Sequence, residues 1–345
     1  MKVVLLFPKY YTLLNTFKKG LLPFCSKIFD IDYFDYTPVW KRKVNTQVFR
    51  LPNNIRTKWD KQYFRSINKK YIDEIGTIEP DYIFIYNNQG LLPDTLEILK
   101  RKSKIIFFLG DSPFYTFTNG ENLRILSYAD LIISPDSFWK EQLEILGLKN
   151  IHFDLIGFDE STNYKLQPSE DMISKYSCDI LFIGLNYVDS WGYKRALFLS
   201  KFAEFDLRIH GNSLWLRWFE IFPELKEKFT MKGQYSEEFV NLLMNCAKLY
   251  PVDANPGLLN GVHLRIFNNI ASGLLPLVEY RKDVETIFKK HGLPIIKNYD
   301  KAADMARYYL NNENERIEII KNLRSYVQLN YSPEKSIGRI LDLLR

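Results

Sequence analysis

One arginine and two asparagines lie between two apolar segments in the C-terminal half of the chain. Asn260 precedes Arg265 by five residues, and Asn268 follows Asn260 by eight. A guanidinium group can hold phosphate oxygens through paired hydrogen bonds, and amide side chains can bind hydroxyl groups. Residues of these types could therefore bind the phosphate and hydroxyl groups of a ligand. A structural ion pair for Arg265 and helix packing for Asn268 are the alternatives.

A second anion-binding pattern follows the apolar run 179–184. Gly184 ends this run, and Lys194 and Arg195 come next in the first turns of an expected helix. Glycine lets the backbone approach a ligand closely, and a helix N-terminus with adjacent cations favours phosphate. The pattern predicts phosphate contacts from these three residues. An ordinary strand-to-helix turn is the alternative.

Two residues have the chemistry of acid–base catalysts. Asp111 follows the apolar run 104–109, and a carboxylate in this position can accept a proton from a hydroxyl group. Aspartate also favours turns, so a turn cap is the alternative. His263 lies at the start of the predicted helix 262–272, beside Arg265, and is the second candidate. A purely structural role is its alternative.

Apolar runs that alternate with amphipathic stretches must position these residues. The runs with strand character are 3–7, 31–36, 81–86, 104–109, 130–134, 151–156, 179–184, 206–210, 247–252 and 274–279. Helical patterns occur at 93–102, 137–146, 191–204, 235–246, 262–272 and 333–345. This alternation predicts an α/β fold with parallel sheets covered on both faces. In such sheets ligands bind outside the carboxyl ends of the strands, where the candidate residues lie.

A polar segment, 157–176, interrupts the alternation and is typical of a linker. The sequence therefore predicts two Rossmann-like domains that face a central cleft. We expect an N-terminal domain over 1–160 and a C-terminal domain over 177–330. The remaining segment, 331–345, is expected to form a helix that packs back on the N-terminal domain.

The segment that begins at Arg265 carries a family resemblance. It reads RIFNNIASGLLPLVEYRKDVETIF, with an arginine, then a small-residue turn that ends at Gly273, then a hydrophobic strand. This order and spacing resemble the donor-site region of the CgeB-like GT-B glycosyltransferases, and the resemblance spans roughly 178–290. The turn Gly110-Asp111-Ser112-Pro113 is similar to a strand–aspartate–proline turn in the N-terminal domain of that group.

The resemblance implies the GT-B fold and a glycosyltransferase. Its C-terminal domain would hold a nucleotide-sugar donor, and its N-terminal domain would hold a glycan, lipid-linked or protein acceptor. It also places His210 and Gly211, which follow the run 206–210, near the donor nucleotide. No metal or other cofactor is implied, which agrees with the lack of a convincing DxD-like motif.

Two positions depart from the family pattern. Asn260 and Asn268 occupy the positions where the broader group has two glutamates, and an amide cannot act as a charged acceptor. This departure motivates an alternative, a non-catalytic protein that binds a sugar or a partner. A GT-B-like epimerase is a third possibility, disfavoured because no convincing pair of catalytic acids is present.

The composition is that of a globular protein. The 345 residues are 46% hydrophobic and 26% charged, and no apolar run approaches the length of a membrane span. The N-terminal apolar run is short and lacks the cleavage site of a secretory signal. Three scattered cysteines and four histidines argue against a zinc centre or a disulfide framework. We therefore expect a cytoplasmic protein without a metal site.

The net charge of +6 is concentrated in the segment 41–70. This segment contains ten Lys and Arg residues and one acid, Asp60, interspersed with aromatic residues such as Trp59, Tyr63 and Phe64, and Trp40 directly precedes it. Such a segment attracts polyanions, and aromatic residues among the charges suit a membrane interface. Three interpretations stay open: a solvated surface, an anionic membrane or lipid-linked acceptor, and a nucleic acid. The last is disfavoured because no nucleic-acid-binding motif accompanies the charge.

Overall fold

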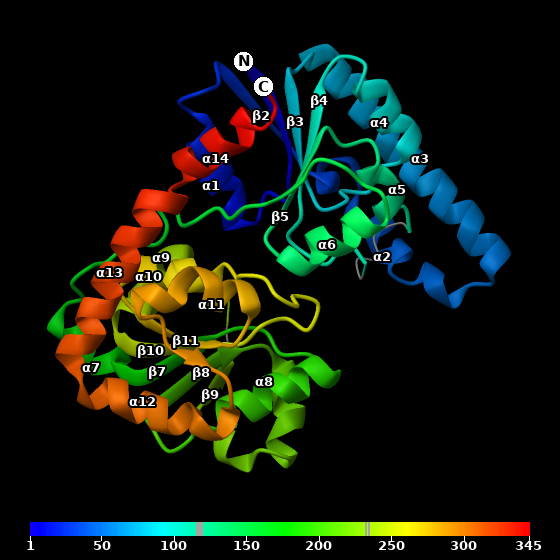
Figure 1. Cartoon of the computed structure of the whole chain (residues 1–345). Coiled ribbons are helices and arrows are strands. Elements are labelled where there is room, and N and C mark those ends of the chain that lie inside the picture. The colour runs from blue at the N-terminus through cyan, green and yellow to red at the C-terminus, as the bar shows by residue number, and fades with distance from the viewer. Residues whose placement is uncertain (115–119, 232, 234) are drawn as a thin grey trace. The chain divides into compact units, whose positions relative to one another are not determined.

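The computed structural model describes residues 1–114, 120–231, 233 and 235–345, and gives Phe49 by its backbone alone. The chain forms two compact units (Figure 1). Unit 1 consists of Met1–Ile156 together with Pro333–Arg345, and unit 2 of Gly157–Ser332. Each unit contains one six-stranded sheet with helices packed around it.

The sheet of unit 1 is parallel throughout. Its strands in spatial order are β2 (Lys27–Ile31), β1 (Lys2–Leu6), β3 (Tyr82–Tyr86), β4 (Lys104–Phe108), β5 (Leu131–Ser134) and β6 (Ile151–Phe153). The central strands β1, β3 and β4 are almost continuously apolar, and every residue after the first of each strand is buried, as expected for a sheet covered on both faces. Neighbouring strand ends therefore lie along one edge.

The helices of unit 1 connect these strands. They are α1 (Thr12–Leu21), α2 (Val39–Asn45), α3 (Asn53–Ile78), α4 (Pro93–Leu99), α5 (Asn122–Leu126), α6 (Ser137–Ile145) and α14 (Pro333–Asp342), with short 3₁₀ turns η1 (Tyr33–Tyr36) and η2 (Val48–Arg50). Helix α14 packs against α1, so the last helix of the chain belongs to unit 1. The Arg339 guanidinium fixes it further, because Nε donates to Asp154 Oδ2 at 2.9 Å.

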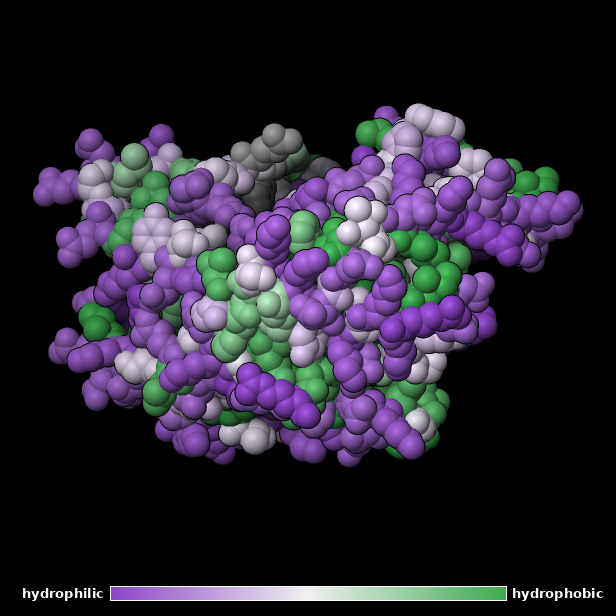
Figure 2. All heavy atoms as spheres, turned by 90° about the horizontal axis from the view of Figure 1, so that it is seen from above, coloured by the Kyte–Doolittle hydropathy of each residue, from purple (hydrophilic) through white to green (hydrophobic). Residues whose placement is uncertain are grey.

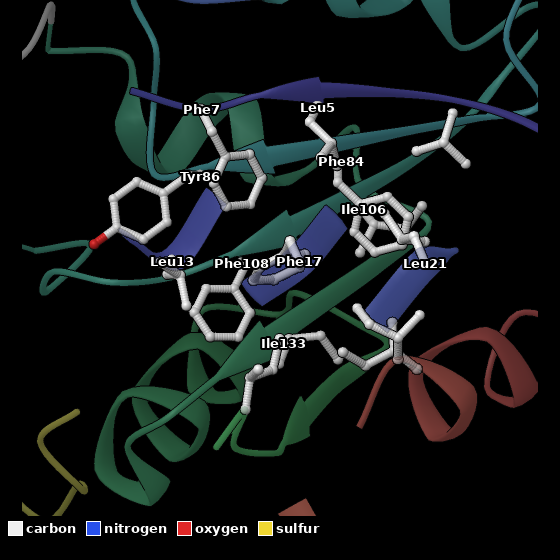
Figure 3. Packing of buried hydrophobic residues seen from close by; sticks show 14 of the residues in the cluster. Leu5, Phe7, Leu13, Phe17, Leu21, Phe84, Tyr86, Ile106, Phe108 and Ile133 are labelled. Atoms are coloured by element: carbon white, nitrogen blue, oxygen red, sulfur yellow. The ribbon is translucent and has the colours of Figure 1, made fainter. Parts of the chain in front are cut away.

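Aromatic and aliphatic side chains fill the core between α1 and the sheet (Figure 3). Phe17 of α1 lies at its centre, with its ring 4.7 Å from that of Phe7 and 5.1 Å from that of Phe108. Ile337 and Ile340 of α14 join the same cluster. A buried apolar stripe on α1 and apolar strands are thus sufficient to explain the packing of this part of unit 1.

The expectation of a strand over 31–36 is wrong. The strand is β2, Lys27–Ile31, and Tyr33–Tyr36 form the 3₁₀ turn η1. Asp32 explains the change, because its side chain accepts a hydrogen bond from Phe34 N at 2.9 Å. The Asp35 side chain in turn accepts a hydrogen bond from Asp32 N at 3.1 Å. This reciprocal cap starts a helical turn where the apolar pattern alone favoured a strand.

The sheet of unit 2 is also parallel. Its strands in spatial order are β12 (Ile295–Ile296), β11 (Leu275–Glu279), β10 (Ala247–Val252), β7 (Cys178–Ile183), β8 (Leu207–Gly211) and β9 (Phe229–Met231). The short outer strands β9 and β12 were not expected from the sequence. The predicted α/β class with two parallel sheets is confirmed.

The helices of unit 2 place the candidate residues. They are α7 (Glu170–Tyr176), α8 (Ser190–Ser200), α9 (Glu237–Asn245), α10 (Arg265–Ala271), α11 (Lys282–Phe288), α12 (Ala302–Asn311) and α13 (Glu313–Tyr331). Four short 3₁₀ turns accompany them: η3 (Ser213–Glu220), η4 (Pro223–Leu225), η5 (Lys289–His291) and η6 (Tyr299–Lys301). Helix α7 lies inside the expected linker and begins where Ser169 Oγ accepts from Met172 N at 3.4 Å. The carboxyl ends of β11, β10, β7 and β8 follow one another along one edge of the sheet.

The surface is mainly hydrophilic on the face shown in Figure 2, where hydrophobic residues gather in a few patches. In the part of the chain that the structure describes, no helix is both long and apolar enough to cross a membrane.

Candidate functional site

A buried carboxylate holds two arginines at the carboxyl end of β10. Asp253 follows β10 directly and is fully buried, and its Oδ2 accepts from Arg195 Nε at 2.8 Å. Its Oδ1 lies 3.7 Å from Arg265 Nη1. Burial alone raises the pKa of Asp253, but the charges of Arg195 and Arg265 outweigh it and lower the pKa to about 2. Asp253 is therefore ionised and anchors both guanidinium groups.

Arg265 presents its guanidinium at the edge of the sheet. The group lies 5.3 Å from the ring centroid of Phe182 on β7, and its side chain is 23% exposed. Nη1 is buried and has no hydrogen-bond partner among the described residues. A buried, unpaired guanidinium donor is costly in a folded protein. Arg265 therefore retains a donor that an anionic ligand can satisfy.

Gly184, the residue after β7, makes room for this guanidinium. A Cβ atom on Gly184 would lie 2.9 Å from Arg265 Nη2 and 2.8 Å from the Phe182 ring. The Gly184 carbonyl accepts from Trp215 Nε1 at 3.0 Å, and Trp215 also packs against Gly211 at the end of β8. Both glycines thus allow close packing at the strand ends.

Arg195 is buried more deeply than Arg265. Its side chain is 1% exposed and makes two contacts, with Asp253 and with the Leu185 carbonyl. Aromatic rings surround the guanidinium, with Trp191 nearest at 4.9 Å. The sequence assigned Arg195 to phosphate contact, whereas the structure uses its donors to support Asp253 and the loop after β7.

Lys194 joins a second charged network at the end of β11. Its Nζ donates to Glu279 and to the Ala254 carbonyl, the latter at 3.0 Å. Glu279 is 8% exposed, and its Oε1 also accepts from Arg281 Nη1 at 3.0 Å. Its Oε2 accepts from Ala254 N at 3.0 Å. Glu279 therefore ties the loop after β10 to the end of β11.

Across both networks the cations outnumber the carboxylates. Four basic side chains share two acids, Asp253 and Glu279. The basic members are Lys194, Arg195, Arg265 and Arg281. An excess of positive charge in a partly buried site attracts an anion of matching charge.

His263 lies two residues before the start of α10. Its Nδ1 accepts from Arg265 N at 3.1 Å, so the proton of the neutral ring lies on Nε2. Burial, and then the nearby charge of Arg265, lower the pKa of His263 to about 3. The imidazole is consequently neutral at physiological pH.

The two asparagines lie on either side of Arg265 in the sequence. Asn260 lies in the loop after β10, and its carbonyl accepts from Asp283 N at 3.0 Å. Asn268 lies on α10, three residues after Arg265 and so on the same helical face. Both are half-buried.

His210 lies at the end of β8, beside β7. Its Nδ1 lies 3.1 Å from the Tyr235 hydroxyl oxygen. Gly184 N donates to the His210 carbonyl at 2.9 Å, which links the ends of the two strands. The structure thus places His210, Gly211 and Gly184 at neighbouring strand ends in unit 2.

Asp111 belongs to a separate polar cluster in unit 1. Its Oδ2 accepts from Asn87 Nδ2 at 2.8 Å, and Asn87 comes directly after β3. Burial raises the pKa of Asp111, and the hydrogen bond from Asn87 opposes this change. A small pocket adjoins the pair and is also lined by Asn88, Pro113 and Asn122.

Two charged partners were missed by the sequence analysis. Asp253 directly follows the predicted strand 247–252, and Glu279 ends the predicted strand 274–279. Their positions at strand ends were the available signal. Among the described residues, no group of three or more His, Cys, Asp or Glu side chains is arranged to hold a metal ion.

Comparisons with known proteins identify the fold. A glycosyl transferase-like family profile matches residues 194–342, and no curated protein matches the sequence. HepE of Anabaena, solved with UDP-glucose, is 12% identical, with 99% of each chain covered and a TM-score of 0.67. Sucrose-phosphate synthase of Thermosynechococcus elongatus is 13% identical, with 85% of this chain and 80% of that one covered and a TM-score of 0.63. A glycosyltransferase of Rickettsia africae is 12% identical, with 100% and 97% covered and a TM-score of 0.65. The chain therefore has the GT-B fold, and the narrower CgeB-like resemblance stays a prediction.

Proposed function

We propose that the protein is a glycosyltransferase that moves a sugar from a nucleotide-sugar donor to an acceptor hydroxyl. The observation that carries this proposal is the excess of cations at the strand ends of unit 2. Among them, Nη1 of Arg265 has no hydrogen-bond partner among the described residues, although it lies 3.7 Å from Asp253 Oδ1. A leaving nucleoside diphosphate develops negative charge, and preorganised cations stabilise such charge. The profile match over 194–342 includes these strand ends from Lys194 onward and supports the same assignment.

The donor would bind at the carboxyl ends of β7, β10 and β11. Arg265 would hold a phosphate oxygen. Asp253, which is itself held by Arg195, would fix the position of the Arg265 guanidinium. Gly184 and Gly211 would let the backbone approach the nucleotide, and His210 would lie beside it. Asn260 and Asn268 would bind sugar or ribose hydroxyls as neutral partners, where a carboxylate would act as a charged acceptor.

A UDP-sugar is the first donor to test, because HepE was solved with UDP-glucose. The positive charge of Arg265, Lys194 and Arg281 supplies the electrostatic role that a divalent cation plays elsewhere. We therefore propose that transfer needs no metal. His263 is neutral, and its Nδ1 accepts a hydrogen bond from Arg265 N. It would therefore donate a hydrogen bond from Nε2 to the nucleotide sugar and would not transfer a proton between substrates.

Unit 1 would supply the acceptor side. Asp111 would remove the proton from the acceptor hydroxyl as that oxygen attacks the donor sugar. A raised pKa makes its carboxylate a stronger base than an ordinary aspartate, and the Asn87 hydrogen bond orients it. The acceptor would be a glycan, a lipid-linked sugar or a protein.

The test is nucleotide release from a panel of nucleotide sugars, with and without EDTA. We expect slow release of UDP from at least one UDP-sugar by water, increased by an acceptor and insensitive to EDTA. Loss of release in Arg265→Ala, with release retained in Lys290→Ala as an exposed control, would support the assigned site. Tight UDP binding without turnover of any donor would favour a non-catalytic sugar-binding protein, the role that Asn260 and Asn268 suggest.

A further inference from the structure

Residues 39–70 form a strongly basic surface in unit 1, hereafter the basic arm. It consists of α2, η2 and the first two thirds of α3, and Figure 1 shows α2 and the start of α3 lying away from the sheet. Asp60 is the one acid of this segment and lies 3.6 Å from Arg56. The donor site proposed above uses no residue of this arm.

Helix α2 is attached by one side and exposed on the other. Arg42 lies over the Phe34 ring at 4.4 Å, and Asn45 Oδ1 accepts from Trp59 Nε1 at 3.1 Å. No residue of α2 is buried. Val39, Trp40 and Val44 are 57%, 60% and 40% exposed, and helical spacing places them on one face together with Lys43. The helix thus presents a mixed apolar and basic face to solvent.

Helix α3 adds a basic stripe. Lys58, Lys61, Arg65 and Lys69 are exposed and follow one another at helical spacings of three and four. They lie opposite the buried side chains, which include Tyr63, Phe64 and Ile67. None of the four basic side chains forms an ion pair with another described residue. Their charge is therefore available to a partner.

The structure separates the aromatic residues of the segment into two groups. Tyr63 and Phe64 are 5% exposed and belong to the core. Trp59 donates a hydrogen bond to the Asn45 side chain. Trp40 remains outside, and Leu51 and Ile55 near the start of α3 are also exposed, at 42% and 49%. Among the described side chains of the basic arm, the strongly exposed apolar groups are thus the Trp40 indole and several branched aliphatic side chains, interspersed with lysines and arginines.

We propose that the basic arm docks the protein on an anionic lipid bilayer. Basic side chains would bind the headgroups, and Val39, Trp40 and Val44 would enter the interfacial layer. Charge alone would suit any polyanion, but exposed tryptophan and aliphatic residues beside the charges fit the headgroup–acyl boundary and not a hydrated phosphate backbone. The inference goes beyond sugar transfer, and vesicle binding tests it without any turnover.

The first experiment measures co-sedimentation of the full chain with phosphatidylcholine vesicles, with and without phosphatidylserine. We expect binding only with phosphatidylserine, and a steep loss as salt is raised. Lys58→Glu/Lys61→Glu/Arg65→Glu should lower the partition coefficient by about 100-fold or more, since each basic residue near the surface contributes about fivefold. The matched control reverses three exposed lysines of unit 2, Lys226→Glu/Lys290→Glu/Lys321→Glu, and should bind nearly as wild type.

The second experiment tests insertion of the apolar face. Trp40→Ala/Val44→Ser should weaken vesicle binding at every salt concentration, whereas Ile145→Ala, which removes a 74% exposed side chain elsewhere in unit 1, should not. Nitroxide-labelled lipids should quench part of the tryptophan fluorescence of the wild type, and this part should disappear in Trp40→Phe. All variants alter exposed side chains, so their thermal unfolding should match the wild type and thereby exclude misfolding.

Three results would each overturn the proposal. One is a wild type that ignores phosphatidylserine vesicles at low salt. Another is equal vesicle binding by the α3 triple variant and its control. The third is retention of DNA or RNA at lower protein concentrations than vesicles require, which would identify a nucleic acid as the partner.

Discussion

Asn87 holds the carboxylate of Asp111 by donating from Nδ2 to Oδ2 at 2.8 Å. Asn87 Oδ1 accepts in turn from the backbone N–H groups of Gly110, at 2.7 Å, and Asp111, at 3.1 Å. Its backbone has a positive φ of 54°, a conformation that asparagine adopts more readily than most residues. One side chain after β3 therefore fixes both the turn after β4 and the carboxylate in it.

This relationship predicts a pH effect in the variant Asn87→Gly. Glycine keeps the positive φ but removes the hydrogen bond that lowers the pKa of Asp111, so the pKa should rise further. Since a general base acts when ionised, the acid limb of the kcat/KM profile should move to higher pH.

Asp111→Asn is the companion variant and should lower kcat by ~10²–10⁴ while UDP binding stays unchanged. An unshifted profile in Asn87→Gly, or near wild-type turnover in Asp111→Asn, would assign Asp111 to the turn alone.

Arg265→Ala should weaken UDP binding more than uridine binding. The variant loses a charge-assisted contact to phosphate, worth about 1.5–3 kcal/mol, which corresponds to roughly 10- to 150-fold in Kd. Isothermal titration calorimetry with both ligands measures the difference directly. Equal affinities for UDP in the variant and the wild type would mean that Arg265 serves only as a partner for Asp253.

Gly184→Ala should reduce UDP affinity by displacing the Arg265 guanidinium. The new Cβ would lie 2.9 Å from Nη2 and 2.8 Å from the Phe182 ring, so at least one of them must move. Gly76→Ala is the matched control, because a Cβ there meets no atom within 4 Å, and alanine in this helix should be neutral or stabilising. If both variants bind UDP as the wild type does, the guanidinium position does not matter for binding.

His263 should not titrate near neutral pH. Because its pKa lies at about 3, its Cε1–H NMR signal should stay at the neutral position between pH 5 and 8. His263→Gln identifies the signal among the four histidines. A midpoint close to 6.5 would contradict the neutral imidazole and reopen an acid–base role.

Asp253→Asn should destabilise the protein by roughly 3–5 kcal/mol, because it leaves the buried Arg195 without its counter-charge. The folded-state pKa of Asp253 is lowered, so its contribution is complete above the unfolded-state pKa of about 4 and is lost as pH falls towards 2. The difference in urea stability between wild type and variant should therefore shrink below pH ~4. Asp304→Asn, in an exposed pair with Arg307, should change stability by less than about 1 kcal/mol.

The sequence predicted the central strands well because their apolar runs are long and end at turn-forming residues. It missed β9 and β12, since β12 has two residues and β9 has two exposed side chains among three. It also placed Arg195 in a ligand contact. Helix position alone cannot distinguish a donor that faces a ligand from one that turns inward to a buried acid, and Asp253 becomes visible as that acid only in the fold.

The aromatic residues of the basic arm show a similar limit. Trp40, Trp59, Tyr63 and Phe64 look alike as residues scattered among charges, yet α3 turns Tyr63 and Phe64 into the core. Spacing along one helix predicts which residues share a face but not which face the sheet covers. That choice depends on the neighbouring strands, which the local sequence does not contain.

The packing of α14 on α1 has a consequence for biosynthesis. Unit 2 is continuous in sequence, so all of its residues are translated before Pro333 is. Unit 1 needs Ile337 and Ile340 to cover α1, and therefore stays incomplete while the whole of unit 2 is made. Its exposed apolar surface during that interval makes the nascent N-terminal half a substrate for chaperones, and makes loss of the last helix more damaging to the first half of the chain than to the second.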